Sequence, residues 1–277
     1  MLRKMPIMAA ALLVGVAISA GESVVASHLS VSLISAYKAI APGHISWVGL
    51  RFKLDPGWHI YWQDPGDSGE PPSVRWNLPE GVTAGPIRWP APRRIPDHTL
   101  VDYGYERSVL LAAPIRLSRT VLAGAPIKLS ATVSYLVCRD VCIPGSAHVG
   151  ISLPLSHRGP LEPSEWHTLF LETRSRWPRP APARWKVTAV ATPKQFMLIL
   201  HTGSAERSAL FFPANPAVIT NAAPQKATAL ADGVQLILEK SDLLAKPLSR
   251  LEGVIVLNRK GAFTITAPIY SETRGGQ

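Results

Sequence analysis

Cysteine is nearly absent from this sequence of 277 residues, which contains only Cys138 and Cys142. So low a count excludes a miniature fold held together by many disulfides, and the chain therefore has to fold by burying apolar surface. Each cysteine also has only one possible partner within the chain. We therefore expect any intramolecular disulfide to join these two positions, and the question is whether that bond is structural or redox-active.

Long apolar runs are also absent, apart from one near the N-terminus at residues 7–18. This run follows a basic start and precedes the small residues Ala20 and Ala26, which is the pattern of a secretory signal. It is too short to span a bilayer as a membrane anchor. We therefore expect residues 1–26 to be a signal peptide, with cleavage near one of the two alanines, and the protein to be exported.

Concentrated positive charge is missing as well. The formal net charge is +10 at pH 7, but the basic residues are scattered, and no run of them is longer than two. A solvated surface explains this distribution better than a stripe that binds a phosphate backbone, and no nucleic-acid-binding motif is recognisable. We therefore predict no nucleic-acid partner.

Alternating apolar and polar residues dominate the rest of the chain and are clearest at residues 48–54 and 127–137. Such alternation predicts strands with one face in a core and the other in water. Proline- and glycine-rich turns separate the strands without helical patterns between them, so we predict an all-β fold with an antiparallel β-sandwich at residues 27–160. Residues 87–96 are dense in proline, and we expect an irregular connection there instead of a strand.

One helix is expected after this sandwich, with Ser164 as its N-cap. The residues that share its apolar face are Trp166, Leu169, Phe170 and Trp177. A proline-rich segment at residues 178–182 ends the helix, so we assign residues 161–184 to a short helix and stiff linker. Residues 185–277 then form a second, smaller β-domain. It contains no cysteine and no convincing ionisable cluster, and we expect it to be structural or to contact a partner.

The segment around the cysteines favours a redox role. A disulfide that closes so short a loop removes little chain entropy and stabilises the fold by about 2 kcal/mol or less. The charged residues Arg139 and Asp140, followed by an expected turn at residues 143–145, indicate an exposed loop. Arg139 beside Cys138 also favours the thiolate form. We therefore favour a redox couple over a structural disulfide in a non-catalytic, partner-binding sandwich, which remains the main alternative.

A metal site is a third interpretation of the cysteine pair. Two thiolates could join His59, His98 or His148 to bind copper or zinc. Nothing in the sequence places these histidines near the cysteines, and a solvated or hydrogen-bonded histidine is the simpler explanation of each. We predict no metal, with copper handling kept as an alternative.

Three segments of the chain are distinctive, at residues 58–69, 101–106 and 135–145. Together they resemble the periplasmic N-terminal region of DsbD-type thiol:disulfide interchange proteins, and most closely the copper-sensitivity-suppressor (ScsB-like) branch. The most specific element is the Cys-x-x-x-Cys followed by Ile-Pro-Gly. Residues 211–213 and 223–225 resemble the second β-domain of that branch, so the resemblance covers nearly the whole mature chain.

The resemblance implies an immunoglobulin-like sandwich in the periplasm that works as a protein-disulfide reductase, of the kind linked to cytochrome c biogenesis and copper tolerance. Its cysteine pair would pass electrons from a separate membrane donor to periplasmic thioredoxin-fold proteins, with no cofactor besides the disulfide. Cys142 would form the mixed disulfide with the target, and Cys138 would resolve it.

The resemblance also implies roles for neighbouring residues. Tyr103 and Tyr105 would supply an aromatic cap over the cysteine pair, for which packing at the sandwich edge is the alternative. Tyr61 and Asp64 would lie beside the site, and either Asp64 or Asp102 would take a proton during exchange. The sequence departs from the family pattern in two ways: the best-known member spaces its cysteines more widely, and we find neither a membrane domain nor a C-terminal thioredoxin-like domain here. We therefore expect either that the electron donor is another polypeptide or that the protein has lost the relay function.

Overall fold

The computed structural model describes residues 23–119, 121, 125–156, 160–258 and 260–271. Most of the predicted signal peptide therefore lies outside the described residues. Its last part forms strand β1 (Val24–Ala26), which pairs antiparallel with β2 (Leu29–Ser35). Cleavage after Ala20 would leave β1 in the mature protein, whereas cleavage after Ala26 would remove it.

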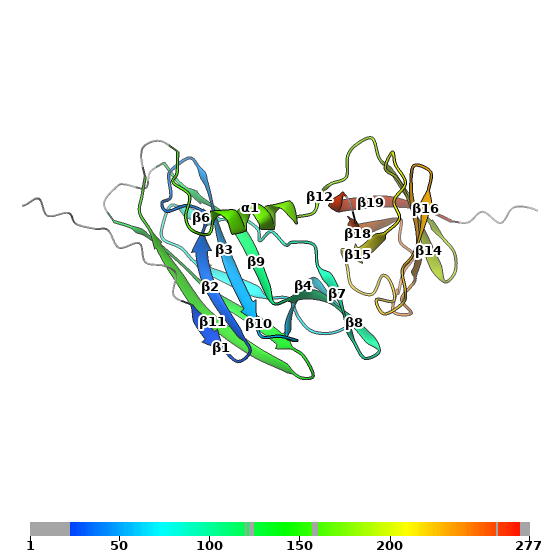
Figure 1. Ribbon diagram of the computed structural model, residues 1–277, viewed down its shortest axis with the longest axis horizontal. Helices are drawn as coiled ribbons and strands as arrows, with labels where there is room; N and C mark the ends of the chain where they lie inside the picture. The colour runs from blue at the N-terminus through cyan, green and yellow to red at the C-terminus, as the bar shows by residue number, and fades with distance from the viewer. Residues whose placement is uncertain (1–22, 120, 122–124, 157–159, 259, 272–277) are drawn as a thin grey trace, which may run out of the picture.

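The first domain is built of two antiparallel sheets (Figure 1). One sheet contains, in order, β1, β2, β3 (Ile45–Leu54), β9 (Ser108–Leu117) and β6 (Val82–Ala84). The other contains, in order, β11 (Cys142–Leu153), β10 (Ile127–Cys138), β4 (His59–Gly66), β8 (Leu100–Glu106) and β7 (Arg93–Asp97), with β5 (Ser73–Asn77) also paired to β10. This arrangement confirms the predicted antiparallel sandwich.

Alternation along the strands builds the core between these sheets. On β3, Val48, Leu50 and Phe52 are fully buried, and on β10 the residues from Leu129 to Val137 alternate in burial as the period of two requires. Residues of both sheets belong to one continuous cluster of buried apolar side chains. The pattern that predicted the strands therefore also decides which face of each strand is inside.

Two sequence predictions for the first domain are wrong. Within residues 87–96, the end of the proline-dense segment enters strand β7, where Pro96 pairs with Val101 at the edge of the sheet. Residues 143–145 were expected to form a turn but belong to β11, which is also an edge strand. Proline is tolerated at such edges because its missing N–H would point away from the ladder.

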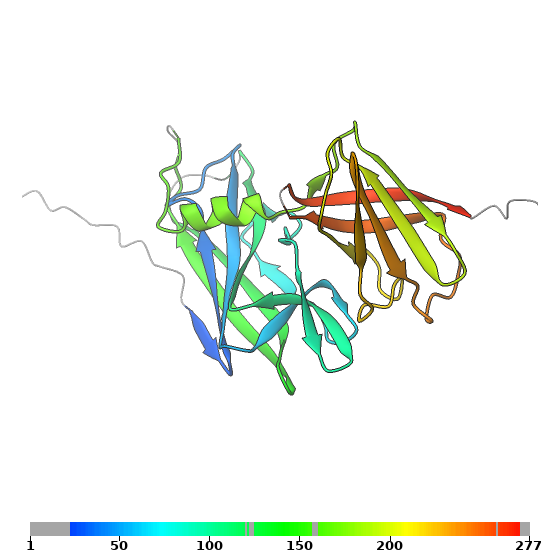
Figure 2. The ribbon, with the colours of Figure 1, turned by 45° about the vertical axis from the view of Figure 1, so that its right-hand side comes forward.

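The predicted helix is present as α1 (His167–Ser175), and it lies across the first domain (Figure 2). The Ser164 hydroxyl accepts a hydrogen bond from the Trp166 backbone N–H at 3.1 Å, although the helix begins slightly later than a Ser164 cap would place it. Phe170 is buried against Ile34 and Leu110 on the outer face of the first sheet. The helix thus covers a face that would otherwise be open to solvent.

The proline-rich linker joins the second domain's sheet. Its residues Arg179–Pro180 form β12, which pairs in parallel with β19 (Gly261–Ser271). The remaining strands follow in the order β15 (Ala209–Pro213), β18 (Arg250–Leu257), β19, β13 (Lys186–Ala191), β14 (Gln195–His201), β17 (Gly233–Glu239) and β16 (Lys226–Leu230). Among the residues described, no helix is long and apolar enough to cross a membrane.

The second domain does contain an ionisable cluster, contrary to the sequence prediction. Glu206 is buried, accepts a hydrogen bond from the Thr202 hydroxyl at 3.0 Å, and pairs with Lys260 at 2.5 Å. No local pattern indicates this pairing because Lys260 lies in the turn between β18 and β19, far along the chain from Glu206. The cluster compensates a carboxylate that burial would otherwise destabilise.

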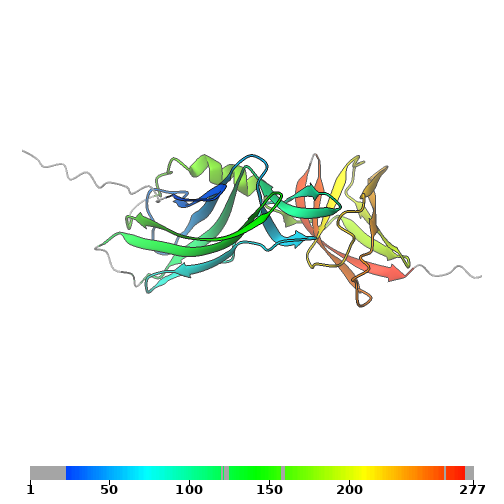
Figure 3. The same ribbon diagram turned by 90° about the horizontal axis from the view of Figure 1, so that it is seen from below.

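The two domains lie end to end and share apolar contacts (Figure 3). Phe212 of β15 makes edge-to-face contacts with Trp62 and Tyr103 of the first domain, at centroid distances of 6.1 Å and 5.0 Å. Val254 and Ala262 of the second domain also belong to the core cluster of the first. The domain interface is therefore continuous with a hydrophobic core.

We expect Phe212→Ala to lower the free energy of unfolding by about 3–5 kcal/mol, because it empties a site where the side chain is only 1% exposed. Thermal or denaturant unfolding measures this loss. Leu243→Ala is the control, since Leu243 is 78% exposed in the same domain and its truncation should change stability by less than about 0.5 kcal/mol. Equal effects of the two substitutions would show that Phe212 does not join the domains.

Candidate functional site

The two cysteines close a hairpin. Cys138 is the last residue of β10 and Cys142 the first of β11, and the register places them directly opposite each other with a Cα–Cα distance of 4.2 Å. They form a disulfide. The three residues between them turn the chain, with the Arg139 N–H donating to the Val141 carbonyl at 3.1 Å.

The two sulfur-bearing residues differ in exposure. Cys138 is only 1% exposed, whereas Cys142 is exposed, and the neighbouring Val141 at the tip of the hairpin is 62% exposed. A thiolate or a disulfide on another protein can therefore come into contact with Cys142 before it reaches Cys138. Cys138 can react only with a sulfur that is already at the site.

The contacts of the Arg139 guanidinium are with Asp140 and Trp58 and not with the sulfur atoms. Its Nε donates to the Asp140 carboxylate at 2.7 Å, and its guanidinium lies 5.3 Å from the centre of the Trp58 ring. Trp58 in turn stacks on His28 at 3.9 Å. Because Asp140 neutralises part of the positive charge, Arg139 contributes less to a thiolate than its sequence position suggests.

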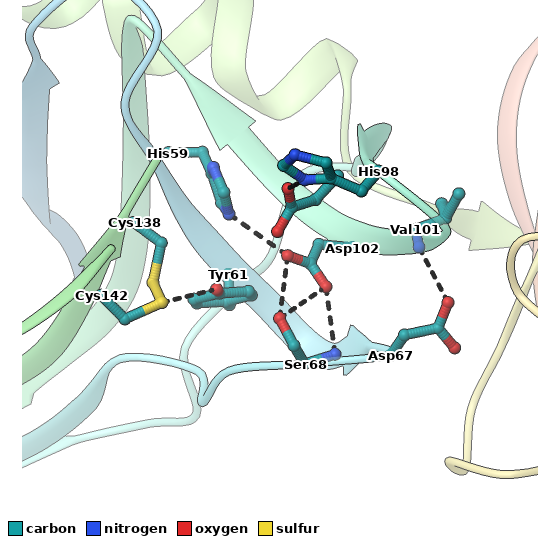
Figure 4. Close-up of polar contacts among 10 residues, drawn as sticks. His59, Tyr61, Asp67, Ser68, His98, Val101, Asp102, Cys138 and Cys142 are labelled. Carbon is teal, nitrogen blue, oxygen red and sulfur yellow. Dashed lines mark hydrogen bonds and ion pairs between the residues drawn. A yellow bond between two sulfur atoms is a disulfide. The ribbon is translucent and has the colours of Figure 1, made fainter. Parts of the chain in front are cut away.

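Tyr61 provides the polar group nearest to the exposed sulfur. Its hydroxyl lies 3.6 Å from Cys142 Sγ, while the side chain is fully buried (Figure 4). Burial raises the pKa of Tyr61 to about 12, and the Ser68 hydroxyl opposes part of this rise. Tyr61 therefore keeps its proton at neutral pH and can donate a hydrogen bond to a Cys142 thiolate.

His59 and Asp102 form a buried pair next to Cys138. His59 is the register partner of Cys138 on β4, and its Nε2 lies 3.4 Å from Asp102 Oδ2 (Figure 4). This distance is longer than an ordinary hydrogen bond. The Ser68 backbone N–H and hydroxyl both donate to Asp102 Oδ1, at 3.0 Å and 2.9 Å. Ser68 thereby fixes the carboxylate that faces His59.

Asp64 is buried on β4 and accepts a hydrogen bond from the Gly66 N–H at 3.2 Å through Oδ1. Its Oδ2 has no hydrogen-bond partner among the described residues. Burial, opposed by the Gly66 hydrogen bond and reinforced by the charge of Asp67, raises the pKa of Asp64 from 3.8 to about 6. Asp102, and not Asp64, is the carboxylate paired with the histidine beside the cysteines.

The two predicted cap residues are buried. The Tyr103 hydroxyl donates to Asn221 Oδ1 at 2.8 Å, and the Tyr105 hydroxyl donates to the Pro90 carbonyl at 2.7 Å. Burial raises the pKa of both tyrosines above the ordinary value. These contacts agree with the alternative interpretation, in which both tyrosines pack within the sandwich, so a cap role for either residue stays a prediction. The Tyr61 hydroxyl is the tyrosine group that contacts the disulfide.

The three histidines considered as metal ligands occupy different surroundings. His148 is exposed on β11, His98 is exposed and pairs with Asp97 at 2.8 Å, and His59 faces Asp102. In the part of the chain that the structure describes, no group of three or more His, Cys, Asp and Glu side chains could hold a metal ion. The copper alternative gains no support from this geometry.

Sequence reasoning missed the pairing of His59 with Asp102 and the role of Ser68. A signal was present, since His59 and Tyr61 are two residues apart on a strand and therefore point to one face. Their aromatic rings meet edge to face, 5.1 Å apart. No local signal could have indicated Asn221, which lies 118 residues from Tyr103 in the sequence.

The fold and the site define an immunoglobulin-like sandwich with a disulfide at a hairpin tip, in which Cys142 is exposed and Cys138 is buried. A family model described as "Thiol:disulfide interchange protein DsbD, N-terminal" matches residues 30–152. The first sandwich of this chain is a DsbD-type N-terminal domain. Its two cysteines lie within the matched residues and form a disulfide, which agrees with a thiol:disulfide interchange family.

Comparison with solved structures extends the likeness to both domains. The N-terminal periplasmic domain of ScsB from Proteus mirabilis is 17% identical, with 90% of this chain and 98% of that chain covered and a TM-score of 0.66. Two others are too dissimilar to carry an argument: the YadV chaperone (9% identity, 86% and 99% covered, TM-score 0.25) and the periplasmic chaperone SfaE (10%, 87% and 100%, 0.23). No curated protein matches the sequence.

Replacement of Asp64 by asparagine tests its raised pKa. An acid whose pKa is higher in the folded state makes that state bind more protons between pH 3.8 and about 6, so this carboxyl lowers stability as pH rises through that window. Asp64→Asn should remove this loss and increase the free energy of unfolding at pH 7 by about 1–3 kcal/mol relative to wild type. Denaturant unfolding at pH 4 and pH 7 measures it.

The control is Asp140→Asn, which removes an exposed carboxylate from the same region. It should leave the difference in stability between pH 4 and pH 7 as it is in wild type. If Asp64→Asn also leaves that difference unchanged, the Asp64 carboxyl titrates at an ordinary pKa and the assignment is wrong.

Proposed function

We propose that this protein performs thiol:disulfide exchange in the periplasm, as a protein-disulfide reductase that passes electrons through Cys138 and Cys142 to thioredoxin-fold partners. The observation that carries the proposal is the unequal exposure of the two cysteines in a DsbD-type domain. The similar ScsB structure is of a periplasmic domain, which supports the location. A separate membrane protein would supply the electrons.

The reaction begins from the reduced pair. The Cys142 thiolate attacks one sulfur of the oxidised partner's disulfide, that disulfide breaks, and the partner's second sulfur leaves as a thiolate. Cys138 then loses its proton and attacks Cys142 Sγ, which re-forms the intramolecular disulfide and releases the partner's first sulfur. Two electrons and two protons have then reached the partner, and the membrane donor restores the dithiol.

His59 is the group best placed to accept the proton of Cys138. Residues paired in register on antiparallel strands point to the same face, and His59 is paired with Cys138. The Asp102 carboxylate stabilises the imidazolium that would form. Tyr61 has a separate task, since its hydroxyl faces Cys142 and can stabilise that thiolate. Each cysteine thus has its own polar neighbour.

The hairpin tip is the natural docking point for a partner. Val141 presents an exposed apolar side chain beside Cys142, and β11 is an edge strand of its sheet. A thioredoxin-fold protein has to bring a sulfur to Cys142 without opening the sandwich, and this surface allows it. No change in the fold of the first domain is needed for the first step.

Replacement of the resolving cysteine should trap the partner. Reduced Cys138→Ser, mixed with an oxidised thioredoxin-fold protein, is expected to accumulate a mixed disulfide at Cys142, because the sulfur that would release the partner is gone. Mass spectrometry of the intact adduct measures it. Cys142→Ser is the matched control and should give no adduct, since the remaining Cys138 is buried.

The competing readings give different results. A midpoint potential of the wild-type pair between about −180 and −270 mV agrees with exchange, whereas a value well below about −300 mV indicates a structural disulfide in a binding module. Adducts formed equally by both variants would contradict the assigned roles. Stoichiometric binding of Cu(I) by the reduced protein, lost in Cys138→Ser, would favour copper handling instead.

Removal of the imidazole should slow the release of the partner. His59→Gln keeps a hydrogen-bonding side chain but cannot accept the proton of Cys138, so the release from the mixed disulfide at pH 7 should fall by about tenfold or more. Rapid-quench kinetics of the wild-type mixed disulfide and of the variant measure this step. His148→Gln, an exposed histidine on β11, should release the partner at the wild-type rate. Equal rates for both variants would exclude His59 as the proton acceptor.

A further inference from the structure

A residue of the second domain reaches the loop beside the disulfide. Asn221 lies between β15 and β16 and is only 6% exposed. Its Nδ2 donates to Asp67 Oδ1 at 3.0 Å, and its Oδ1 accepts from the Tyr103 hydroxyl at 2.8 Å. Both partners belong to the first domain. The amide side chain therefore makes two hydrogen bonds across the domain interface.

Asn221 is itself held in place from both domains. Arg94 of β7 donates to the backbone carbonyls of Asn221 and Ala223, at 2.5 Å and 3.1 Å. Within the second domain, the Thr220 N–H donates to the Glu239 carbonyl at 2.9 Å. Because the backbone on either side of Asn221 is fixed, its side chain can impose a position on its partners.

The loop at residues 67–69 connects this contact to the sulfur. Asp67 is exposed, but its Oδ2 accepts from the Val101 N–H at 2.8 Å, so both of its carboxylate oxygens are engaged. The next residue, Ser68, donates to Asp102 through both its N–H and its hydroxyl. Two consecutive residues, Asp67 and Ser68, thus hold the loop to β8, and Asp67 also holds it to the second domain.

Gly69 transmits the loop position to Tyr61. Gly69 has a φ of +78°, and a Cβ at this position would come within 2.0 Å of Tyr61 Cζ, the ring carbon that carries the hydroxyl. The Gly69 backbone therefore lies directly against the hydroxyl end of the ring. That hydroxyl is the group 3.6 Å from Cys142 Sγ. Movement of the loop would therefore release the hydroxyl end of the ring.

We propose that Asn221 is a positioning residue for the redox site: by anchoring Asp67, the second domain holds residues 67–69 against Tyr61 and so keeps the Tyr61 hydroxyl at Cys142. The proposal rests on the proposed function in one respect, that Tyr61 stabilises the Cys142 thiolate. It gives the second domain a part in the chemistry of Cys142 by way of Asp67 and Tyr61. The reactivity of Cys142 then depends on domain docking.

Gln225 offers a matched control for Asn221. It lies four residues further along the same segment and also makes two hydrogen bonds through its side-chain amide, to the N–H and carbonyl of Phe211 at 2.7 Å and 2.8 Å. Both of these bonds stay inside the second domain. Gln225→Ala and Asn221→Ala therefore both remove two hydrogen bonds, but only Asn221→Ala releases the loop beside Tyr61.

The experiment measures the reactivity of Cys142 in the full chain carrying Cys138→Ser, so that a single thiol remains. The rate of alkylation by iodoacetamide is followed from pH 5 to pH 10, because it tracks the thiolate fraction. Tyr61→Phe should raise the pKa of Cys142 and slow alkylation at pH 7 by about tenfold, and Asn221→Ala should do so by about threefold. Gln225→Ala should keep the parent profile even where it lowers the melting temperature.

A combined variant and a second substitution sharpen the result. Asn221→Ala together with Tyr61→Phe should be no slower than Tyr61→Phe alone, because Asn221 acts through Tyr61. Asp67→Ala breaks the same contact from the first domain and should reproduce the shift, which keeps the test decisive if Asn221→Ala folds poorly.

The proposal is overturned if Asn221→Ala and Asp67→Ala keep the parent pH profile, since Asn221 would then only pack the interface. It is also overturned if Tyr61→Phe leaves the profile unchanged. Alkylation uses no partner protein, so these outcomes are independent of the trapping experiment. A shift caused by Asn221→Ala, combined with no mixed disulfide in the trapping experiment, would support the positioning role and contradict the exchange function.

Discussion

The unbroken antiparallel ladder between β10 and β11 is the constraint on which the site depends. It pairs each residue from Ile127 to Cys138 with one from Leu153 to Cys142, so the cysteines meet at its closed end. A slip by one residue would separate them and turn the core face of β10 toward solvent. The burial of apolar side chains along β10 therefore fixes the register of the hairpin, and the register positions the two sulfur atoms. The ladder holds the two cysteines together whether or not the disulfide is formed. The domain can therefore stay folded when the disulfide is reduced, and a redox-active pair requires such stability.

The site lowers the stability of the fold, because polar groups are buried in the sheet that carries the disulfide. His59, Asp64 and Asp102 are all buried in the sheet that carries the cysteines, and neither His59 Nε2 nor Asp64 Oδ2 has an ordinary hydrogen-bond partner among the described residues. Leaving such a group unsatisfied costs about 1–3 kcal/mol. An apolar side chain at either position would make a more stable sandwich. His59 lies beside Cys138 and faces Asp102, and the proton transfer proposed above would use a buried pair of this kind.

Much of the first domain could be predicted from the sequence, because alternation and turn residues are local signals. The long strands, the helix and the paired cysteines follow from them. β7 could not be predicted, since Pro96 argues against a strand until its place at a sheet edge is known, and the same holds for Pro144 in β11. Tyr103 was expected to form a cap, which stays a prediction, and its hydroxyl contacts a residue 118 positions away. No local pattern contains such a contact.

The end of β4 and the loop at residues 67–69 show how a segment whose sequence predicts only a turn can make several separate contacts. Gly66 and Gly69 both have positive φ, at +93° and +78°, so the turn does require glycine there. Yet Asp67 contacts the second domain and Ser68 fixes the Asp102 carboxylate, while Gly69 also has no room for a side chain against Tyr61. Each of these three neighbours is tied to a different part of the molecule. Through three neighbouring residues the turn therefore contacts the second domain, the carboxylate that faces His59, and the tyrosine beside Cys142.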